Sequence, residues 1–184
     1  MAFSVNEFRS NLVGDGARPT LFDVTITGSW ATDLAGLKFM AKATSLPAST
    51  IGFKALSYFG HDVQFAGDRT FADWTITVIN DENFKIRNAF EVWMNAIDQN
   101  DQSGSIRKSP ATASPASYVG QGLVQQYGKT GDIIKQYSFY NIWPTELAAI
   151  TVDWDTKDDI ETFDITLKYD YYHALTGAGK QLTT

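Results

Sequence analysis

The fold is decided by a change of period within Trp74–Trp93, which reads WTITVINDENFKIRNAFEVW. In its first third, Trp74, Ile76 and Val78 alternate with threonines. Alternation with a period of two places the apolar side chains on one face of an extended chain, so it predicts a β-strand that is half buried.

The remainder of this stretch changes to helical spacing. Apolar residues recur every three or four positions as far as Ile97, which predicts one amphipathic helix over about residues 82–98. Asn80 or Asp81 is suited to cap its start. We expect the aromatic stripe of this helix to pack on a sheet; a ligand groove is the less favoured reading.

Elsewhere alternation dominates and predicts an antiparallel, mainly β fold in a single domain covering residues 1–184. Strands are predicted at residues 22–27, 37–43, 52–59, 63–71, 119–127, 133–143, 148–154 and 162–171. The polar turn 128–132 joins two of them as a hairpin, and the turn 156–159 joins the last two. The Ser-, Ala- and Pro-rich stretch 102–117 shows no apolar period, so we expect an exposed loop there.

The composition excludes several kinds of chemistry. The chain has no cysteine, which removes thiol catalysis, disulfides and zinc-thiolate sites. Its two histidines, His61 and His173, have no partner at catalytic spacing, and no phosphate-binding glycine loop or nucleophile elbow is present. We therefore predict no enzymatic activity, no cofactor and no metal site.

The charge is concentrated in one region. The segment from Glu146 to Asp170 holds eight acids and two bases and so accounts for the whole net charge of −6. The rest of the chain holds thirteen acids and thirteen bases. A solvated sheet edge is the simplest reading. The acids of residues 153–161 do not follow the ligand order of a calcium loop. A basic-patch nucleic-acid binder is excluded by the sign of the charge.

The amino terminus and the hydropathy argue against export and membrane insertion. Charged and polar residues interrupt residues 1–14, unlike the apolar core of a signal peptide, and no stretch approaches 18 apolar residues. We therefore expect synthesis in the cytoplasm and no membrane insertion. We also expect a role in assembly, because amphipathic strands with one solvated face still need partners for their backbone edges.

The strand-to-helix stretch Trp74–Trp93 resembles the tail tube proteins of contractile-tailed, T-even-like bacteriophages. Supporting it are Leu46-Pro47, Gly60, Gly67-Asp68-Arg69 and the closing Tyr169-Asp-Tyr171-Tyr172. The order of elements agrees from about Pro19 to His173.

The resemblance implies a mainly β subunit with one α-helix and an antiparallel β-sandwich or barrel-like fold. It also implies hexameric rings that stack into a hollow tube, with each subunit giving strands to an inner barrel of about 24 strands. It implies an arm at about residues 44–59 that reaches the neighbouring ring, with Leu46, Pro47, Ile51 and Phe53 as its apolar anchors. It also places the helix toward the outside, where Glu91, Asn95 and Asp98 are candidate outward residues.

If the polar face of the last long strand lines the channel, its candidate residues are Asp164, Thr166, Lys168 and Asp170. A negative lumen would repel phosphate, so double-stranded DNA would pass without specific binding.

The implied function is a structural subunit of the virion tail tube, which serves as a conduit for DNA ejection and a scaffold for the contractile sheath. Its expected partners are copies of itself, the tail sheath protein, and the tube-initiator and tail-terminator proteins. Two alternatives stay open: a tube subunit of a phage-derived injection device that delivers protein, and a carbohydrate-binding β-sandwich.

Overall fold

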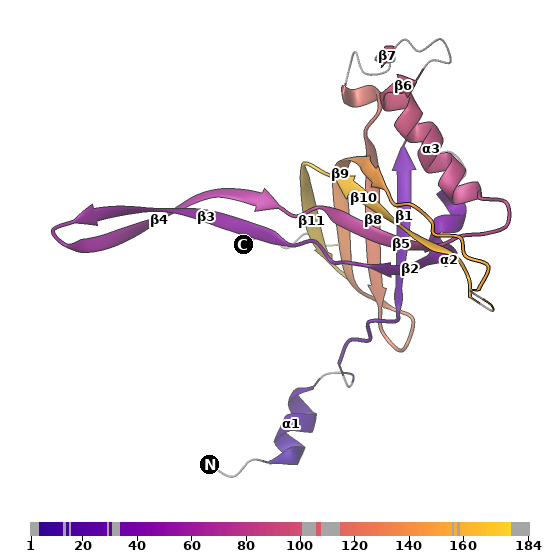
Figure 1. Ribbon diagram of the computed structural model, residues 1–184. Coiled ribbons are helices and arrows are strands. Elements are labelled where there is room, and N and C mark those ends of the chain that lie inside the picture. Colours follow the sequence, from indigo (N-terminus) through magenta and orange to yellow (C-terminus); the bar gives the residue numbers. More distant parts are fainter. Residues whose placement is uncertain are drawn as a thin grey trace.

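The computed structural model describes residues 4–12, 14, 16–28, 30, 34–100, 106–107, 115–155, 157 and 159–177. Seven antiparallel strands build the body (Figure 1). They are β1 (Phe22–Gly28), β2 (Ala41–Thr44), β5 (Trp74–Ile79), β8 (Gly120–Tyr127), β9 (Ile133–Leu147), β10 (Thr162–Lys168) and β11 (Tyr171–Thr176). The prediction of a mainly β, antiparallel fold is confirmed.

The long strand β9 belongs to two halves of this sheet. Its first part pairs with β8 and β11, and with β1 beyond β8 this forms the β8 half, ordered β1–β8–β9–β11. Its last part pairs with β10 in the β10 half, ordered β9–β10–β5–β2. Between the two parts Asn141 adopts a left-handed φ of 56°, and its side-chain amide donates a hydrogen bond of 2.6 Å to Asp170. The strand bends there because a left-handed residue interrupts the extended backbone. Asn tolerates this conformation better than most residues.

The core lies between the two halves. Trp74 of β5 stacks on Phe139 of β9 with ring centroids 4.2 Å apart. Gly122 of β8 makes room for this pair, since a Cβ at that position would lie 2.5 Å from the Trp74 ring. The threonine–apolar alternation of β5 therefore buries Trp74, Ile76 and Val78, as its sequence predicts.

Helix α3 (Lys85–Ile97) follows β5 and packs on the core. Its buried residues are Ile86, Ala89, Phe90, Trp93 and Ala96. The chain turns sharply at Phe84, where φ is 51°, and the carboxylate of Asp81 accepts a hydrogen bond of 3.0 Å from the Lys85 amide. The predicted helix and its packing on the sheet are confirmed, although it begins three residues later than expected.

The prediction of a single helix is wrong. Two more α-helices are present, α1 (Val5–Asn11) and α2 (Leu37–Met40), together with the 3₁₀ turns η2 (Leu34–Gly36) and η4 (Pro115–Ser117). The predicted strand 37–43 is consequently a helical turn followed by β2. Leu34 and Leu37 are both fully buried, and their three-residue spacing suits a helical turn.

The predicted strand 148–154 is also wrong. Residues 148–161 form a loop with no strand among its described residues. Both neighbours of β10 are already supplied by β5 and β9, so a further strand has no edge to join there. The predicted loop 102–117 lies largely outside the described residues. Within it, β7 (Ile106–Arg107) pairs with β6 (Gln99–Asn100), which precedes the loop, and η4 forms its last three residues.

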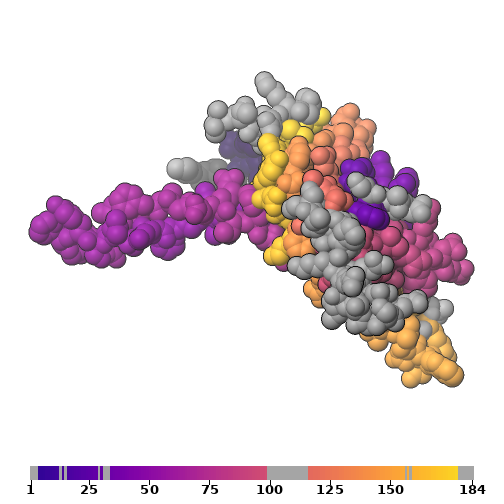
Figure 2. All heavy atoms as spheres, turned by 90° about the horizontal axis from the view of Figure 1, so that it is seen from above, coloured from indigo at the N-terminus to yellow at the C-terminus, as the bar shows by residue number. Residues whose placement is uncertain are grey.

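A two-stranded hairpin of β3 (Ser49–Tyr58) and β4 (His61–Phe71) projects far from the body (Figures 1 and 2). Its two strands confirm the predicted strands 52–59 and 63–71. Because both strands project, the projecting segment continues to Phe71, beyond residue 59 where the predicted arm ends. Residues 148–161, here called the acidic loop, protrude in Figure 2 on the side of the body opposite this hairpin.

Candidate assembly interface

The β8 half has two open edges. Within the described part of the chain, β1 pairs only with β8 and β11 pairs only with β9. No strand of the described residues pairs with the outer side of β1 or of β11, and such an edge is a template for pairing with another chain. In the β10 half the outermost strand is β2, which has only four residues and leads into the projecting hairpin.

One face of the β8 half is polar and points away from the core. The strand registers place amide and hydroxyl side chains side by side in rows across the four strands. The face consists of Thr25, Thr27, Gln121, Leu123, Gln125, Gln136, Ser138, Tyr140, Tyr171, His173 and Leu175. A hollow of about 280 Å³ lies on it between β1, β8 and β9, and Gln125 donates a hydrogen bond of 3.0 Å to Gln136.

The carboxylate in the β1 row of this face is neutralised. Asp23 is only 4% exposed, and its Oδ2 lies 3.0 Å from the Lys38 ammonium and accepts a hydrogen bond of 2.6 Å from the Tyr127 hydroxyl. That hydrogen bond, burial and the negative charge of Asp23 together raise the pKa of Tyr127 to about 12. The polar face thus presents mostly uncharged groups.

Three of the four residues predicted to line the channel occupy the other side of the molecule, and the fourth, Asp170, lies at the turn before β11. Asp164, Thr166 and Lys168 lie on the outer face of the β10 half, and the core separates this face from the polar face of the β8 half. Asp164 accepts a hydrogen bond of 2.6 Å from Thr77, and Lys168 forms an ion pair of 2.5 Å with Asp73. Asp170 binds Asn141 at the turn before β11. Whether these residues line a channel stays a prediction, because it depends on neighbouring subunits.

The projecting hairpin carries the predicted arm anchors. Leu46, Ile51 and Phe53 are exposed, with Phe53 72% exposed, and Pro47 is half-buried at the base. Sequence reasoning missed further exposed apolar residues on the same hairpin, which are Leu56, Tyr58, Phe59, Val63 and Phe65. In β4, Val63 and Phe65 alternate with Asp62 and Gln64, a pattern that predicts an apolar face but not whether its partner lies in the same chain. An apolar surface of this extent on a thin hairpin indicates a protein contact.

The outer face of α3 carries the three candidate residues of the helix. Glu91, Asn95 and Asp98 are exposed, and Glu91 forms an ion pair of 3.1 Å with Arg87. The helix is anchored to the body by Arg87, which donates to the Ala148 carbonyl, and by Trp93, whose indole donates to the Tyr118 carbonyl. The outward orientation of these residues in a ring stays a prediction.

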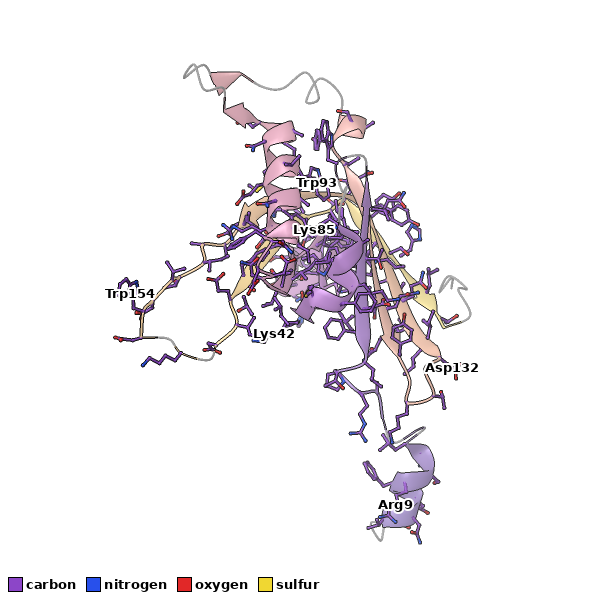
Figure 3. All side chains as sticks on the ribbon, turned by 90° about the vertical axis from the view of Figure 1, so that its right-hand side faces the viewer. Arg9, Lys42, Lys85, Trp93, Asp132 and Trp154 are labelled. Carbon is purple, nitrogen blue, oxygen red and sulfur yellow. The ribbon has the colours of Figure 1, made fainter. Side chains whose placement is uncertain are left out.

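The acidic loop presents an exposed aromatic residue that sequence reasoning assigned to a strand. Trp154 lies at the tip of this loop, as Figure 3 shows, and its side chain is 99% exposed. A hollow of about 470 Å³ lies between the two legs of the loop beside Lys42.

Among the described residues no three His, Asp or Glu side chains converge as metal ligands. No helix in the described ranges is long and apolar enough to cross a membrane.

Three comparisons bear on this geometry. A family described as "Phage tail tube protein" matches residues 4–175. The "Tail tube protein gp19" of Enterobacteria phage T4 is 35% identical over 162 residues, which cover 86% of this chain and 92% of that protein.

Two solved structures share the fold. A chain in the baseplate of the anti-feeding prophage has a TM-score of 0.64 at 8% identity, covering 88% of this chain and 96% of that one. A chain in the sheath-tube complex of the extracellular contractile injection system PVC has a TM-score of 0.54 at 15% identity, covering 95% and 99%. At such identities the likeness concerns the fold alone.

Proposed function

The chain belongs to the phage tail tube protein family, and on that premise we propose that six copies close a ring by joining the open edges of their β8 halves. The chain is a structural subunit of a phage tail tube, and its place is in the virion tail. The family is structural and not enzymatic, in agreement with the expectation from the sequence.

Sequence identity separates the phage tail tube from the tube of a phage-derived injection device. The relative at 35% identity is a phage tail tube protein, whereas the injection-system chains resemble this one in fold at 8% and 15% identity. The phage tail therefore takes precedence over a phage-derived device. A carbohydrate-binding sandwich is displaced by the family match over residues 4–175.

The observation that carries the ring is the pair of open edges on a sheet with an even number of strands. In an antiparallel order of four strands, β1 and β11 run in opposite directions. The β11 of one copy therefore meets the β1 of the next as an antiparallel pair, and the hydrogen-bond ladder continues without a change of direction. Closure leaves the β8 halves without free edges.

The dimensions of such a ring suit a conduit. Four strands from each of six copies give about 24 strands, and at a spacing of about 4.8 Å and a tilt of about 40° the backbone circumference is roughly 150 Å. After subtraction of side chains on both walls, the lumen is roughly 40 Å wide. A DNA duplex about 20 Å wide passes through without contacting the wall.

The polar face of the β8 half is our candidate for the lumen. It lies on the side of the sheet opposite the core, so the core and the β10 half would form the outer layer of the ring. This proposal competes with the sequence prediction for Asp164, Thr166 and Lys168, because the two faces point in opposite directions, whereas Asp170 lies at the turn before β11. An uncharged lining of amides and hydroxyls neither attracts phosphate nor binds bases in a fixed register, which suits DNA in transit.

The remaining surfaces supply the other proposed contacts. The projecting hairpin, with anchors Leu46, Pro47, Ile51 and Phe53, would join neighbouring rings during stacking. The outer face of α3, with Glu91, Asn95 and Asp98, would face the sheath. Solved chains of this fold occur in a sheath-tube complex and in a baseplate, which supports sheath and tube-initiator partners here, and a tail terminator would close the other end.

Paired cysteines test the ring directly, because the chain has no cysteine of its own. Within one copy, β1 and β11 are separated by two strands, or about 14 Å, which a disulfide does not span. We expect Thr25→Cys or Thr27→Cys, combined with His173→Cys or Leu175→Cys, to give disulfide-linked dimers and higher multimers in assembled protein. A tilt of 35–45° displaces neighbouring copies by about four to six residues, so the pair that links reports the register.

The matched control pairs Thr27→Cys with Thr166→Cys on the β10 half. Thr166 lies across the core from the β8 half, so we expect no cross-link. Assembled protein without any β1–β11 cross-link in the panel would contradict the proposed ring.

A further inference from the structure

Among the described residues, the apolar stripe of helix α1 is largely uncovered by its own subunit, and only Leu12 borders a hollow beside the turn between β8 and β9. Val5, Phe8 and Leu12 are 67%, 67% and 42% exposed, and their spacing of three and four residues puts them on one side of the helix. None of the seven residues of α1 is buried. Figure 1 shows the helix lying apart from the sheet, beyond the start of β1.

Such a helix has little reason to persist alone. A single helix of two turns is far below the length at which isolated helices are stable in water. The Ser4 hydroxyl caps it by accepting a hydrogen bond of 3.3 Å from the Glu7 amide, which offsets only part of the cost of ordering the helix. Burial of the apolar stripe against another surface is the missing contribution.

We infer that α1 packs its Val5–Phe8–Leu12 stripe on a second copy of this chain in the assembled tube. The inference rests on the proposed function, since it needs neighbouring copies at the β1 edge. Three features of the subunit select this occupant: the place where α1 is tethered, the size of the stripe and its charge.

The tether places α1 beside the proposed ring contact. Residues after the helix are fixed to the end of β8, because Tyr127 donates its amide to Leu21 and Gln126 donates its side-chain amide to the Arg18 carbonyl. The chain from residue 13 to residue 17 spans at most about 18 Å. The β11 of the copy joined to β1 lies one strand spacing, about 4.8 Å, from that edge. The adjoining copy is therefore within reach.

The size of the stripe argues against an independent partner. Three partly exposed side chains offer on the order of 300 Å² of apolar surface, whereas a stable interface needs about 800 Å² on each side. The stripe is sufficient only as an extension of a larger contact. The β1 edge next to it supplies that contact when the second copy is present.

The charge of α1 permits close approach of copies. The net charge of −6 lies between Glu146 and Asp170, so that region repels another copy at low ionic strength. Residues 4–12 hold one acid, Glu7, and one base, Arg9, and have no net charge. Copies can therefore crowd at this helix without an electrostatic penalty.

Single cysteines make the test direct. Phe8→Cys on the stripe and Ser10→Cys on the opposite side are each labelled with a maleimide before and after assembly. We expect assembly to slow labelling at position 8 at least tenfold and to leave position 10 within about twofold. Equal labelling rates at position 8 in free and assembled protein would overturn the inference.

A photocrosslinker identifies what covers the stripe. With benzophenone-maleimide on Phe8→Cys, irradiation of tubes is expected to give covalent dimers of this chain. Crosslinks found only within one chain, or dimers that also form in unassembled protein at the same yield, would contradict docking on a second copy in the tube.

Paired substitutions measure the contribution to assembly. Val5→Asp with Phe8→Asp should leave the thermal midpoint of the free subunit unchanged, since no residue of α1 is buried, and should raise the concentration needed for tube formation at least tenfold. Asn6→Asp with Ser10→Asp adds the same charge on the opposite side and should assemble like the parent chain. Equal assembly of both variants would overturn the inference. A parent chain that forms no tubes would instead refute the proposed function. In that case the maleimide labelling rates at positions 8 and 10 would not change between the two conditions.

Discussion

Gly122 shows how a single atom limits what the core accepts. The stacked pair of Trp74 and Phe139 spans the space between the two halves of the sheet, and the glycine leaves the gap that the indole fills. At the other end of β8, Lys38 and Tyr127 both contact Oδ2 of the buried Asp23 carboxylate, at the edge where copies are proposed to meet. Both positions lead to predictions at the scale of the residue.

Gly122→Ala is expected to destabilise the subunit by about 1–3 kcal/mol, because its Cβ would lie 2.5 Å from the Trp74 ring and force the core apart. Urea unfolding followed by tryptophan fluorescence measures the change. Gly128→Ala is the control, since a Cβ there meets its nearest atom at 3.5 Å, an ordinary contact. Equal losses for the two variants would contradict the close packing.

Tyr127 predicts a loss of stability at high pH. Its pKa is about 12 in the folded chain and about 10 when unfolded, so the neutral hydroxyl stabilises the fold fully below pH 10. That contribution is lost as the pH rises from 10 to 12. Tyr127→Phe should have a flatter unfolding midpoint over this window than the parent chain, measured in urea at fixed salt. Parallel curves would show that the hydroxyl does not donate to Asp23.

At the scale of elements, the projecting hairpin contributes to assembly and not to the fold of the subunit. All residues of β3 are exposed, so its apolar side chains add nothing to the core. The same division holds for the outer face of α3, whose exposed residues are separate from the buried stripe that anchors the helix.

Phe53→Ser is expected to change the free energy of unfolding of the subunit by less than about 0.5 kcal/mol, because Phe53 is exposed. It should weaken tube formation several-fold, because an apolar anchor between rings is lost. Thermal melts and sedimentation of assembled protein measure the two effects. Lys54→Ser, on the alternate face of the same strand, is the control, and an equal loss of assembly in both variants would count against Phe53 as an anchor.

The elements also show where the sequence was informative. The strong periods of β5, α3 and the β8–β9 hairpin predicted these elements because local pattern and tertiary packing agree there. Residues 37–40 and 148–154 misled because alternation and helical spacing coincide over a few residues, and because only the pairing of β10 with β5 and β9 shows that no sheet edge is free. The open edges of β1 and β11 depend on strand order, which no local pattern contains.

At the scale of the whole molecule, charge opposes the contacts that shape favours. The net charge of −6 makes copies repel, while the proposed ring joins them through backbone hydrogen bonds and apolar side chains. Assembly at low ionic strength should therefore be limited by repulsion that salt screens.

Raising the salt concentration from about 20 mM to about 150 mM shortens the screening length to about 8 Å. We expect this change to lower the protein concentration at which tubes form, as measured by light scattering and sedimentation. Potassium glutamate in place of chloride controls for the identity of the anion. A higher threshold in salt would mean that ion pairs, and not strand edges and apolar anchors, hold the copies together.

If the chain completes its β8 half only against copies of itself, the assembled form must be a closed ring. Electron microscopy of the purified protein over a concentration series shows whether it is. We expect six-fold rings that stack into hollow cylinders with a lumen of roughly 40 Å. Particles that stay single at every concentration, or that assemble with β1 and β11 facing solvent, would contradict it.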